Sequence, residues 1–468
     1  MNYLSFGFFV FFAVLLIGLK FTRNAKQQNV MLLLASYVFY ALGDVRFLGL
    51  LIGVSVLMWI LGKGIGRELH SGKAKRYLVS GVIVDVLVLG IFKYFNFFAE
   101  GFGTLLGLEY NALHIILPIG ISFYIFQSIS YLADVYTGKI EAEASALPVL
   151  LYIGFFPQIV SGPIVKAHDF LPQVKEHHKL TWERLSEGAQ RFVMGVFKKT
   201  VIADRLGVAV NAVYAAPEAY SGLSLLVTVL AYSLQIYYDF SGYSDMAIGV
   251  AHILGFDLGA NFNLPYLAKN PSEFWRRWHI SLSSWFRDYV YIPLGGSRKG
   301  KARTYLNLFI TMLLSGLWHG ASWAFVVWGA MHAVASVLHK WFADMKKRHG
   351  WDKKESKLLG GLSMLAMFVS VSVLWIPFRL NDFGQSLRVL QRIVTWSDGV
   401  DYVYVFTLIF AVLLLVVELI ALLKNKGNHI WKPLDLSRFW SKVIVCLFVL
   451  LIVCFAYIGD SAFIYAQF

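Results

Sequence analysis

The sequence predicts an all-α integral membrane protein whose many transmembrane helices form a single polytopic domain. Of its 468 residues, 58% are hydrophobic and only 15% are charged, a composition unlike that of soluble proteins. Apolar runs that approach the ~20 residues needed to cross the hydrocarbon core recur along the whole chain. We therefore expect about ten or eleven crossings within one domain, residues 1–468, and not a soluble domain with an anchor.

The basic residues lie where the positive-inside rule expects them in a membrane protein. A net charge of +14 could suggest a nucleic-acid partner, but the lysines and arginines gather in short loops between apolar runs. We therefore expect membrane lipid around the protein and no nucleic acid. Cys446 and Cys454 share one apolar run, so they indicate neither a disulfide framework nor a metal site.

The apolar runs can be followed in order when the basic loops are taken as cytoplasmic. The first, residues 3–19, follows no basic region and precedes no small-residue cleavage site, so we interpret it as a retained span. The later expected crossings are residues 30–42, 47–61, 77–92, 113–133, 223–238, 325–341, 358–376, 403–423 and 443–458. This order places both termini outside the cytoplasm.

Two stretches depart from this pattern of spans. Residues 147–205 contain short apolar pieces cut by prolines and glycines, which predicts a re-entrant or broken helix. Within them, residues 167–191 are polar with one apolar face, as expected of a helix at the cytoplasmic surface. No repeat of fixed period occurs, which argues against a repeat-built transporter.

Residues 270–328 carry the main functional signal, because His279 and His319 lie there beside arginines, tryptophans and glycines. Residues 270–303 hold too many charges for a lipid-facing span, since one charge at the bilayer centre costs about 2.5–3.5 kcal/mol. We expect this part in the cytoplasmic interface. From Tyr305 the chain is apolar, and fourteen helical residues reach about 21 Å, which places His319 deep in the membrane.

These residue types suit acyl transfer. A hydroxyl that attacks a thioester must lose its proton, and a histidine that accepts it contributes roughly 10² to 10⁴ in rate. His319 is the candidate base, and His279 would orient the thioester or help the thiol leave. Gly316 and Gly320 would let a substrate or another helix approach closely. The alternative is that His319 is merely hydrogen-bonded between helices.

A basic cluster near His279 is a candidate donor site. Arg276, Arg277 and Arg287, together with Trp278, could bind an anionic donor such as a nucleotide-bearing coenzyme through its phosphates. The alternative is that these arginines only retain their loop in the cytoplasm.

Other histidines give weaker signals. His332 lies thirteen residues beyond His319, and Gly320 is expected to end the helix between them, so a role for His332 is only weakly indicated. His177 and His178 lie in a polar loop and are expected to be solvated. No HExxH, CxxC or paired histidine and carboxylate spacing is present, so we expect no metal.

At these residues the sequence resembles the membrane-bound O-acyltransferase (MBOAT) family, in particular its bacterial branch that acetylates alginate. The resemblance spans nearly the whole chain, and motifs of this length are specific. The matching motifs are residues 32–41, 117–136, 155–164, 239–249, 271–296 and 316–320.

The resemblance implies a helical fold that encloses a central tunnel, with the acyl donor entering from the cytoplasm and the acceptor reached from outside. His319 is similar to the family's catalytic histidine, and His279 to its second histidine. The donor in this branch is acetyl-CoA, or a carrier-protein thioester in D-alanyl transfer. Extracytoplasmic transferase or esterase-like partner proteins then modify alginate, cellulose or peptidoglycan outside the bacterial cytoplasmic (inner) membrane.

The last residues, 463–468, resemble an aromatic C-terminal motif of this branch. The hypothesis is that Tyr465 carries the acyl group transiently on its phenol at the outer mouth of the tunnel. The alternative is a tyrosine that anchors a helix end at the interface. Two further functions stay open, which are D-alanyl or other acyl transfer to teichoic acid or lipid, and a proton-coupled transporter whose histidines relay protons.

Overall fold

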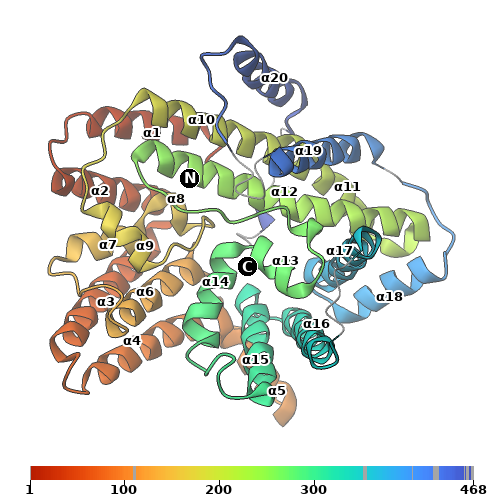
Figure 1. The fold of residues 1–468 in the computed structure, drawn as a ribbon, viewed down its shortest axis with the longest axis horizontal. Helices are drawn as coiled ribbons and strands as arrows, with labels where there is room; N and C mark the ends of the chain where they lie inside the picture. Colours follow the sequence, from red (N-terminus) through yellow and green to blue (C-terminus); the bar gives the residue numbers. More distant parts are fainter. Residues whose placement is uncertain are drawn as a thin grey trace. The chain divides into compact units, whose positions relative to one another are not determined.

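The regular secondary structure that the computed structural model describes is helical (Figure 1). The described residues are 2–108, 112–350, 356–402, 404–424, 432–457, 459 and 463–464. Within these ranges no β-strand forms, and the only bridge of β type joins Tyr220 to Val400. The predicted all-α class is confirmed.

The chain divides into two compact units. Unit 1 comprises Met1–Phe192 and Ser244–Gly259, and unit 2 comprises Val193–Tyr243 and Ala260–Phe468. Helix α12 (Gly222–Leu254) is continuous over its 33 residues and contributes residues to both units, as does α10 (Trp182–Val196). The organisation of residues 1–468 as one functional domain stays a prediction.

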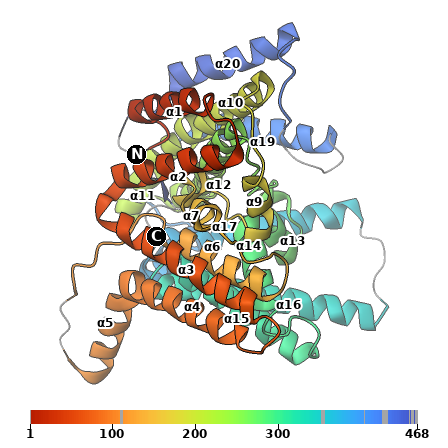
Figure 2. The same ribbon diagram turned by 90° about the vertical axis from the view of Figure 1, so that its left-hand side faces the viewer.

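Unit 1 is built around α6 (Ile121–Tyr136), whose residues are nearly all buried. Two glycines let neighbouring helices approach α6, because a Cβ on Gly62 would collide with the ring of Tyr131, and one on Gly81 with Leu132. Helices α3 and α4 run side by side in Figure 2. The other helices of this unit are α1 (Phe6–Leu19), α2 (Ala25–Asp44), α3 (Leu48–Glu68), α4 (Ala74–Leu89), α5 (Phe95–Leu106), α7 (Ala146–Gly154), α8 (Phe156–Ile159), α9 (Ala167–Val174) and most of α10 (Trp182–Val196).

The region predicted to be broken is broken, although its pieces differ from the expectation. Helix α7 ends at Gly154, and α8 is a single turn. The helix expected over residues 167–191 is instead two helices, α9 and α10, separated by residues 175–181. The expected solvation of His178 is wrong, because its Nε2 lies 2.8 Å from the carbonyl oxygen of Gln173 and its ring packs against Phe256.

Unit 2 holds both predicted histidines. Helix α12 does not end at Tyr238 as expected but continues to Leu254, and Gly242 in this continuation packs closely against the backbone of Gly195. Helices α15 and α16 pack side by side along their length (Figures 1 and 2). The helices of unit 2 besides α12 are α11 (Asp204–Ala215), α13 (Pro271–Arg277), α14 (Ile280–Phe286), α15 (Lys301–His319), α16 (Trp323–Arg348), α17 (Lys357–Leu380), α18 (Phe383–Val394), α19 (Val405–Lys424) and α20 (Phe439–Phe455).

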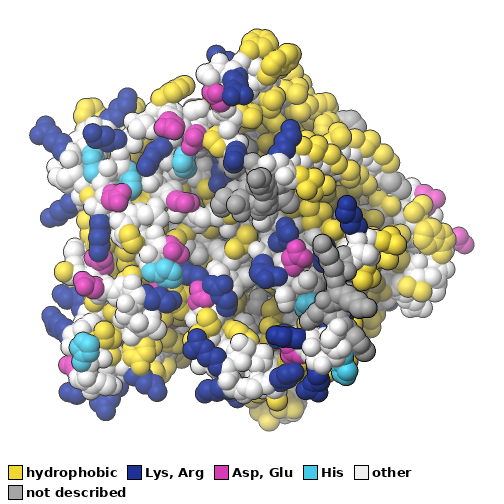
Figure 3. Space-filling model, in the orientation of Figure 1, with side chains coloured by type: hydrophobic (Ala, Val, Ile, Leu, Met, Phe, Trp, Pro, Cys, Tyr) yellow, Lys and Arg dark blue, Asp and Glu magenta, His cyan; other side chains and the backbone are white. Residues whose placement is uncertain are grey.

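Several helices are long and apolar enough to cross a membrane. In the described chain four helical stretches meet this condition, and three shorter apolar helices accompany them. On the face in Figure 3, lysines and arginines gather over α13 to α16, whereas hydrophobic side chains cover α19. The four stretches are Ala25–Glu68, Ala74–Leu106, Gly222–Leu254 and Lys357–Leu380, and the shorter helices are Phe6–Leu19, Thr407–Ala421 and Phe439–Phe455. The count of ten or eleven crossings stays a prediction.

Candidate active site

His319 is the last residue of α15, and its side chain is buried with 1% of the residue exposed. Its ring meets Trp328 and Phe378 edge-on, with ring centres 5.0 and 5.3 Å apart. The backbone becomes extended at Gly320, so the helix ends there as expected from the sequence. His319 is therefore presented at a helix end and enclosed by aromatic rings.

Two glycines bring α15 and α16 together beside His319. A Cβ on Gly316 would lie 2.7 Å from Cα of Gly329, closer than real Cβ atoms approach other atoms. At this crossing the backbones are therefore in direct contact, a packing typical of helices in membranes. The sequence predicts that small residues near His319 let a substrate or another helix approach closely. This is confirmed for another helix, because α16 packs directly against Gly316.

His279 joins α13 to α14 and is completely buried. Its φ of 42° is in the left-handed region, which costs about 1–3 kcal/mol for a residue other than glycine. Its Nδ1 lies 3.1 Å from Oδ1 of Asn261, which also accepts a hydrogen bond from the hydroxyl of Ser281 at 2.9 Å. Because Oδ1 only accepts, His279 carries its proton on Nδ1, and Nε2 is the acceptor nitrogen.

The indole of Trp318 contacts the rings of both histidines. Its ring centre lies 6.0 Å from that of His279 and 5.0 Å from that of His319. The ring of His279 also meets Phe240 of α12 edge-on, with ring centres 4.6 Å apart. The structure thus brings together the two histidines that the sequence singled out, although they are forty positions apart.

His332 is closer to this arrangement than the sequence indicated. It is buried on α16, and its ring lies 4.6 Å from Trp328, which also contacts His319. Ser336 continues the same helix face at i+4 spacing. Among the described residues, Nε2 of His332, Nε1 of Trp328 and Oγ of Ser336 have no hydrogen-bond partner. Trp328, His332 and Ser336 are spaced four residues apart on α16, so their buried polar atoms form a row that begins beside His319.

The arginines of the basic cluster lie in different environments. Arg277 is held in place, because Nη2 pairs with Glu273 at 2.8 Å and Nη1 donates to the carbonyl of Asn263 at 3.1 Å. Although partial burial alone would raise it, hydrogen bonds from Lys269 N and from Arg277 lower the pKa of Glu273 below its ordinary value. Arg276, in contrast, has an exposed side chain.

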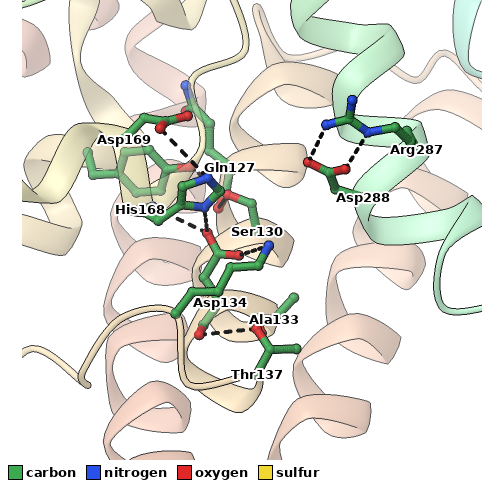
Figure 4. Close-up of polar contacts among 11 residues, drawn as sticks. Gln127, Ser130, Ala133, Asp134, Thr137, His168, Asp169, Arg287 and Asp288 are labelled. Carbon is green, nitrogen blue, oxygen red and sulfur yellow. Dashed lines mark hydrogen bonds and ion pairs between the residues drawn. The ribbon is translucent and has the colours of Figure 1, made fainter.

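Two other candidates for donor binding are engaged by neighbours. The guanidinium of Arg287 forms a two-pronged pair with Asp288, at 2.6 and 3.1 Å (Figure 4). Trp278 is fully buried, with its ring 5.0 Å from Trp375 and 5.1 Å from Phe262. Trp278 therefore packs in the aromatic core that supports His279 instead of lying at a surface.

The structure also pairs groups that no sequence motif indicated. In unit 1, Nδ1 of His168 lies 2.7 Å from the carboxylate of Asp134, which also binds Lys139 at 3.2 Å (Figure 4). These residues come from separate elements, so spacing alone gave no signal. Among the described residues, no group of three histidine, cysteine or acidic side chains could hold a metal ion. Tyr465 lies outside the described residues.

The geometry defines a multi-helix membrane protein with two buried histidines in contact with one tryptophan. A family model described as MBOAT, membrane-bound O-acyltransferase family, matches residues 141–349. The chain is 40% identical over 396 residues to the probable alginate O-acetylase AlgI of Azotobacter vinelandii, which covers 84% of this chain and 77% of that protein. It is 34% identical over 400 residues to the peptidoglycan O-acetyltransferase of Helicobacter pylori, covering 80% and 75%.

The chain belongs to the membrane-bound O-acyltransferase family. It is a multi-pass membrane enzyme that uses an acyl donor, and the resemblance inferred from the sequence motifs is confirmed. A lower similarity, 30% over 250 residues, relates it to the teichoic acid D-alanyltransferase of Bacillus subtilis, covering 50% of this chain and 61% of that protein. Family membership favours an acyltransferase over the proton-coupled transporter.

Proposed function

We propose that this protein passes an acetyl group from cytoplasmic acetyl-CoA across the membrane for O-acetylation of an extracytoplasmic polysaccharide. The observation that carries the proposal is the contact of one indole, Trp318, with both His279 and His319. Relatives named for acetylation of alginate and of peptidoglycan support an acceptor polymer of that kind. The bacterial cytoplasmic membrane is the location consistent with these relatives.

His319 is proposed as the catalytic base. Its imidazole takes the proton from the attacking hydroxyl as the oxygen bonds to the thioester carbonyl carbon. The carbon–sulfur bond then breaks, coenzyme A leaves as a thiolate, and the proton passes from His319 to that sulfur. The aromatic enclosure of His319 excludes water, which would otherwise compete for the acyl group.

His279 is proposed to orient the donor. Because its Nδ1 proton is committed to Asn261, Nε2 is suited to accept a hydrogen bond from an N–H group of the pantetheine arm. The cationic Arg276 is exposed on α13, the helix that precedes His279, and is proposed to contact the nucleotide phosphates. Arg277 and Arg287, which bind Glu273 and Asp288, are proposed to support this surface, and Trp278 to support His279.

Transfer to the polymer is proposed to require further components. Extracytoplasmic partner proteins of the transferase or esterase-like type would accept the acetyl group. Tyr465 is proposed as the intermediate carrier, and its neighbour Ile464 is held by a buried carboxylate of unit 2, Asp239. In that step the tyrosine phenol replaces the sulfur on the acetyl carbon, and the partner's hydroxyl later replaces the phenol.

The proposed base is tested with purified protein in proteoliposomes supplied with labelled acetyl-CoA. His319→Gln should lower acetyl release from the donor by about 10² to 10⁴ with unchanged thermal stability. His339→Gln, at a half-buried histidine of α16, is the matched control and should retain full activity. A His319→Gln protein that is stable and fully active would refute the proposal. A D-alanyl carrier-protein thioester as the preferred donor would favour D-alanyl transfer instead.

A further inference from the structure

The described residues at the end of α20 and after it are hydrogen-bonded to other parts of unit 2. Three hydrogen bonds connect these residues to the π-helical segment Phe197–Ala203, to the start of α11 and to α12, and one of the three is made by Phe455, the last residue of α20. They join Nε of Arg205 to O of Phe455 (2.5 Å), N of Tyr457 to O of Thr200 (2.9 Å), and N of Ile464 to Oδ2 of Asp239 (2.9 Å). The C-terminal segment, which comprises the residues after α20, is therefore held at two described positions, Tyr457 against the π-helical segment and Ile464 against α12.

The last of these bonds uses a buried carboxylate. Asp239 is 1% exposed, and its Oδ1 forms an ion pair with Nζ of Lys199 at 2.6 Å. Lys199 also binds Asp204 at 2.7 Å, so one ammonium serves two carboxylates. A buried carboxylate requires donors for both of its oxygens, and the backbone N–H of Ile464 supplies the donor for Oδ2. The interaction is a hydrogen bond to a charged group, the stronger kind.

The side chain next to this bond points toward the histidine site. The ring of Phe463 stacks on Tyr243 at 4.5 Å and lies 5.8 Å from Phe240. Phe240 in turn contacts the ring of His279 at 4.6 Å. Asp239, Phe240 and Tyr243 are consecutive or one turn apart on α12, so a single helix surface holds both the C-terminal segment and His279.

We propose that Asp239 is a positioning residue that holds the C-terminal segment beside His279, so that the residues after Ile464 start from a fixed point next to the reaction. This inference rests on the proposed acetyl transfer for its effect on rate. A neighbouring buried ion pair, which joins Lys198 to Glu418 of α19 at 2.7 Å, serves as the comparison.

The first test measures whether Asp239 holds the segment. The full-length protein in detergent is digested with a carboxypeptidase, and loss of C-terminal residues is followed by mass spectrometry. Asp239→Ala should release them about ten to a hundred times faster than the unchanged protein, as expected from losing a hydrogen bond to a charged group. Glu418→Gln is the matched control and should digest at the original rate. Equal protection in Asp239→Ala would overturn the proposal.

The second test asks whether Asp239 acts through the segment. With acetyl-CoA as donor, Asp239→Ala should lower kcat about tenfold or more and leave KM unchanged, and Asp239→Asn should retain part of the rate because its amide oxygen still accepts. In a chain that ends at residue 462, Asp239→Ala should have no further effect. If the rate losses caused by Asp239→Ala and by the truncation multiply, Asp239 acts independently of the segment and the proposal is overturned.

Two further variants separate the possible failures. If Asp239→Ala does not fold, Phe463→Ala removes the contact with Tyr243 from the other side and leaves the buried charges intact. Faster digestion and a lower kcat are expected, and unchanged values would overturn the proposal. Tyr465→Phe tests the acyl carrier separately, because full activity in that variant would refute the carrier and leave the digestion result for Asp239 unaffected.

Discussion

The orientation of the His279 ring depends on one amide. Asn261 accepts the Nδ1 proton, and its own backbone accepts a hydrogen bond from Ile280 N at 2.9 Å. The second contact is made by the backbone and survives a side-chain substitution. The side chain of Asn261 is therefore the group that selects the tautomer, and its removal isolates that effect.

We predict that Asn261→Ala lowers kcat about tenfold or more. The variant leaves a buried N–H without its acceptor, which costs about 1–3 kcal/mol, or lets the proton move to Nε2. Steady-state kinetics with acetyl-CoA and thermal unfolding measure the two consequences separately. Asn307→Ala, which loses a 3.0 Å hydrogen bond to Gly296 in the same unit, is the control for stability alone. Equal kinetic losses in both variants would contradict the prediction.

The sequence could predict His279 and His319 but not the residues that hold them. An imidazole is conspicuous in an apolar chain, so residue type alone drew attention to both histidines. Asn261 lies eighteen positions before His279 in a loop, and nothing local marks it as a partner. Helix spacing gives His332 only a weak signal, but it lies one turn after Trp328 on α16, and the pairing of α15 with α16 brings Trp328 against His319.

At the scale of the element, the α15 and α16 pair sets the position of His319. We predict that Gly316→Leu lowers both stability and activity, because its side chain must force α16 away from α15 at Gly329. Overpacking of this kind costs about 1–3 kcal/mol. Thermal unfolding and acetyl release measure the two effects. Gly361→Ala on α17, where a Cβ would meet nothing within 4 Å, should leave activity unchanged. A fully active Gly316→Leu protein would contradict the prediction.

Helices were predicted best where hydrophobic runs are long and uniform. Helices α1, α3 and α17 overlap the expected spans, because length and composition alone specify them. The errors fall where polar residues lie inside a helix. Helix α12 continues through Asp239 because Lys199 neutralises the carboxylate, and that partner is forty positions away. A pattern read along one segment gives no information on such compensation.

At the scale of the whole molecule, the net charge of +14 favours electrostatic attraction of an anionic donor. We predict that Arg276→Gln raises KM for acetyl-CoA about two- to fivefold, as expected for one exposed charge pair. KM for acetyl-pantetheine, which lacks the nucleotide phosphates, should not change. Arg388→Gln on α18, also an exposed arginine, is the control. An equal rise for both donors would assign Arg276 to another role.

Composition was sufficient to predict the class of the molecule, whereas the path of the chain end was not predictable. Hydrophobic content and basic loops reflect the solvent around the protein, and they are properties of the sequence alone. The return of Phe463 and Ile464 to α12 depends on a carboxylate more than two hundred positions earlier. Only a folded chain brings these groups together. The aromatic motif at residues 463–468 therefore identifies candidate residues, but it does not predict that Ile464 binds α12.

The left-handed backbone at residue 279 bears on how this position was selected. Glycine would adopt that conformation without the steric cost that a side chain with Cβ incurs, about 1–3 kcal/mol. If only a bend between two short helices were required, glycine would form it at lower energy. The chain instead carries an imidazole there at a thermodynamic disadvantage, as expected where the ring itself is needed.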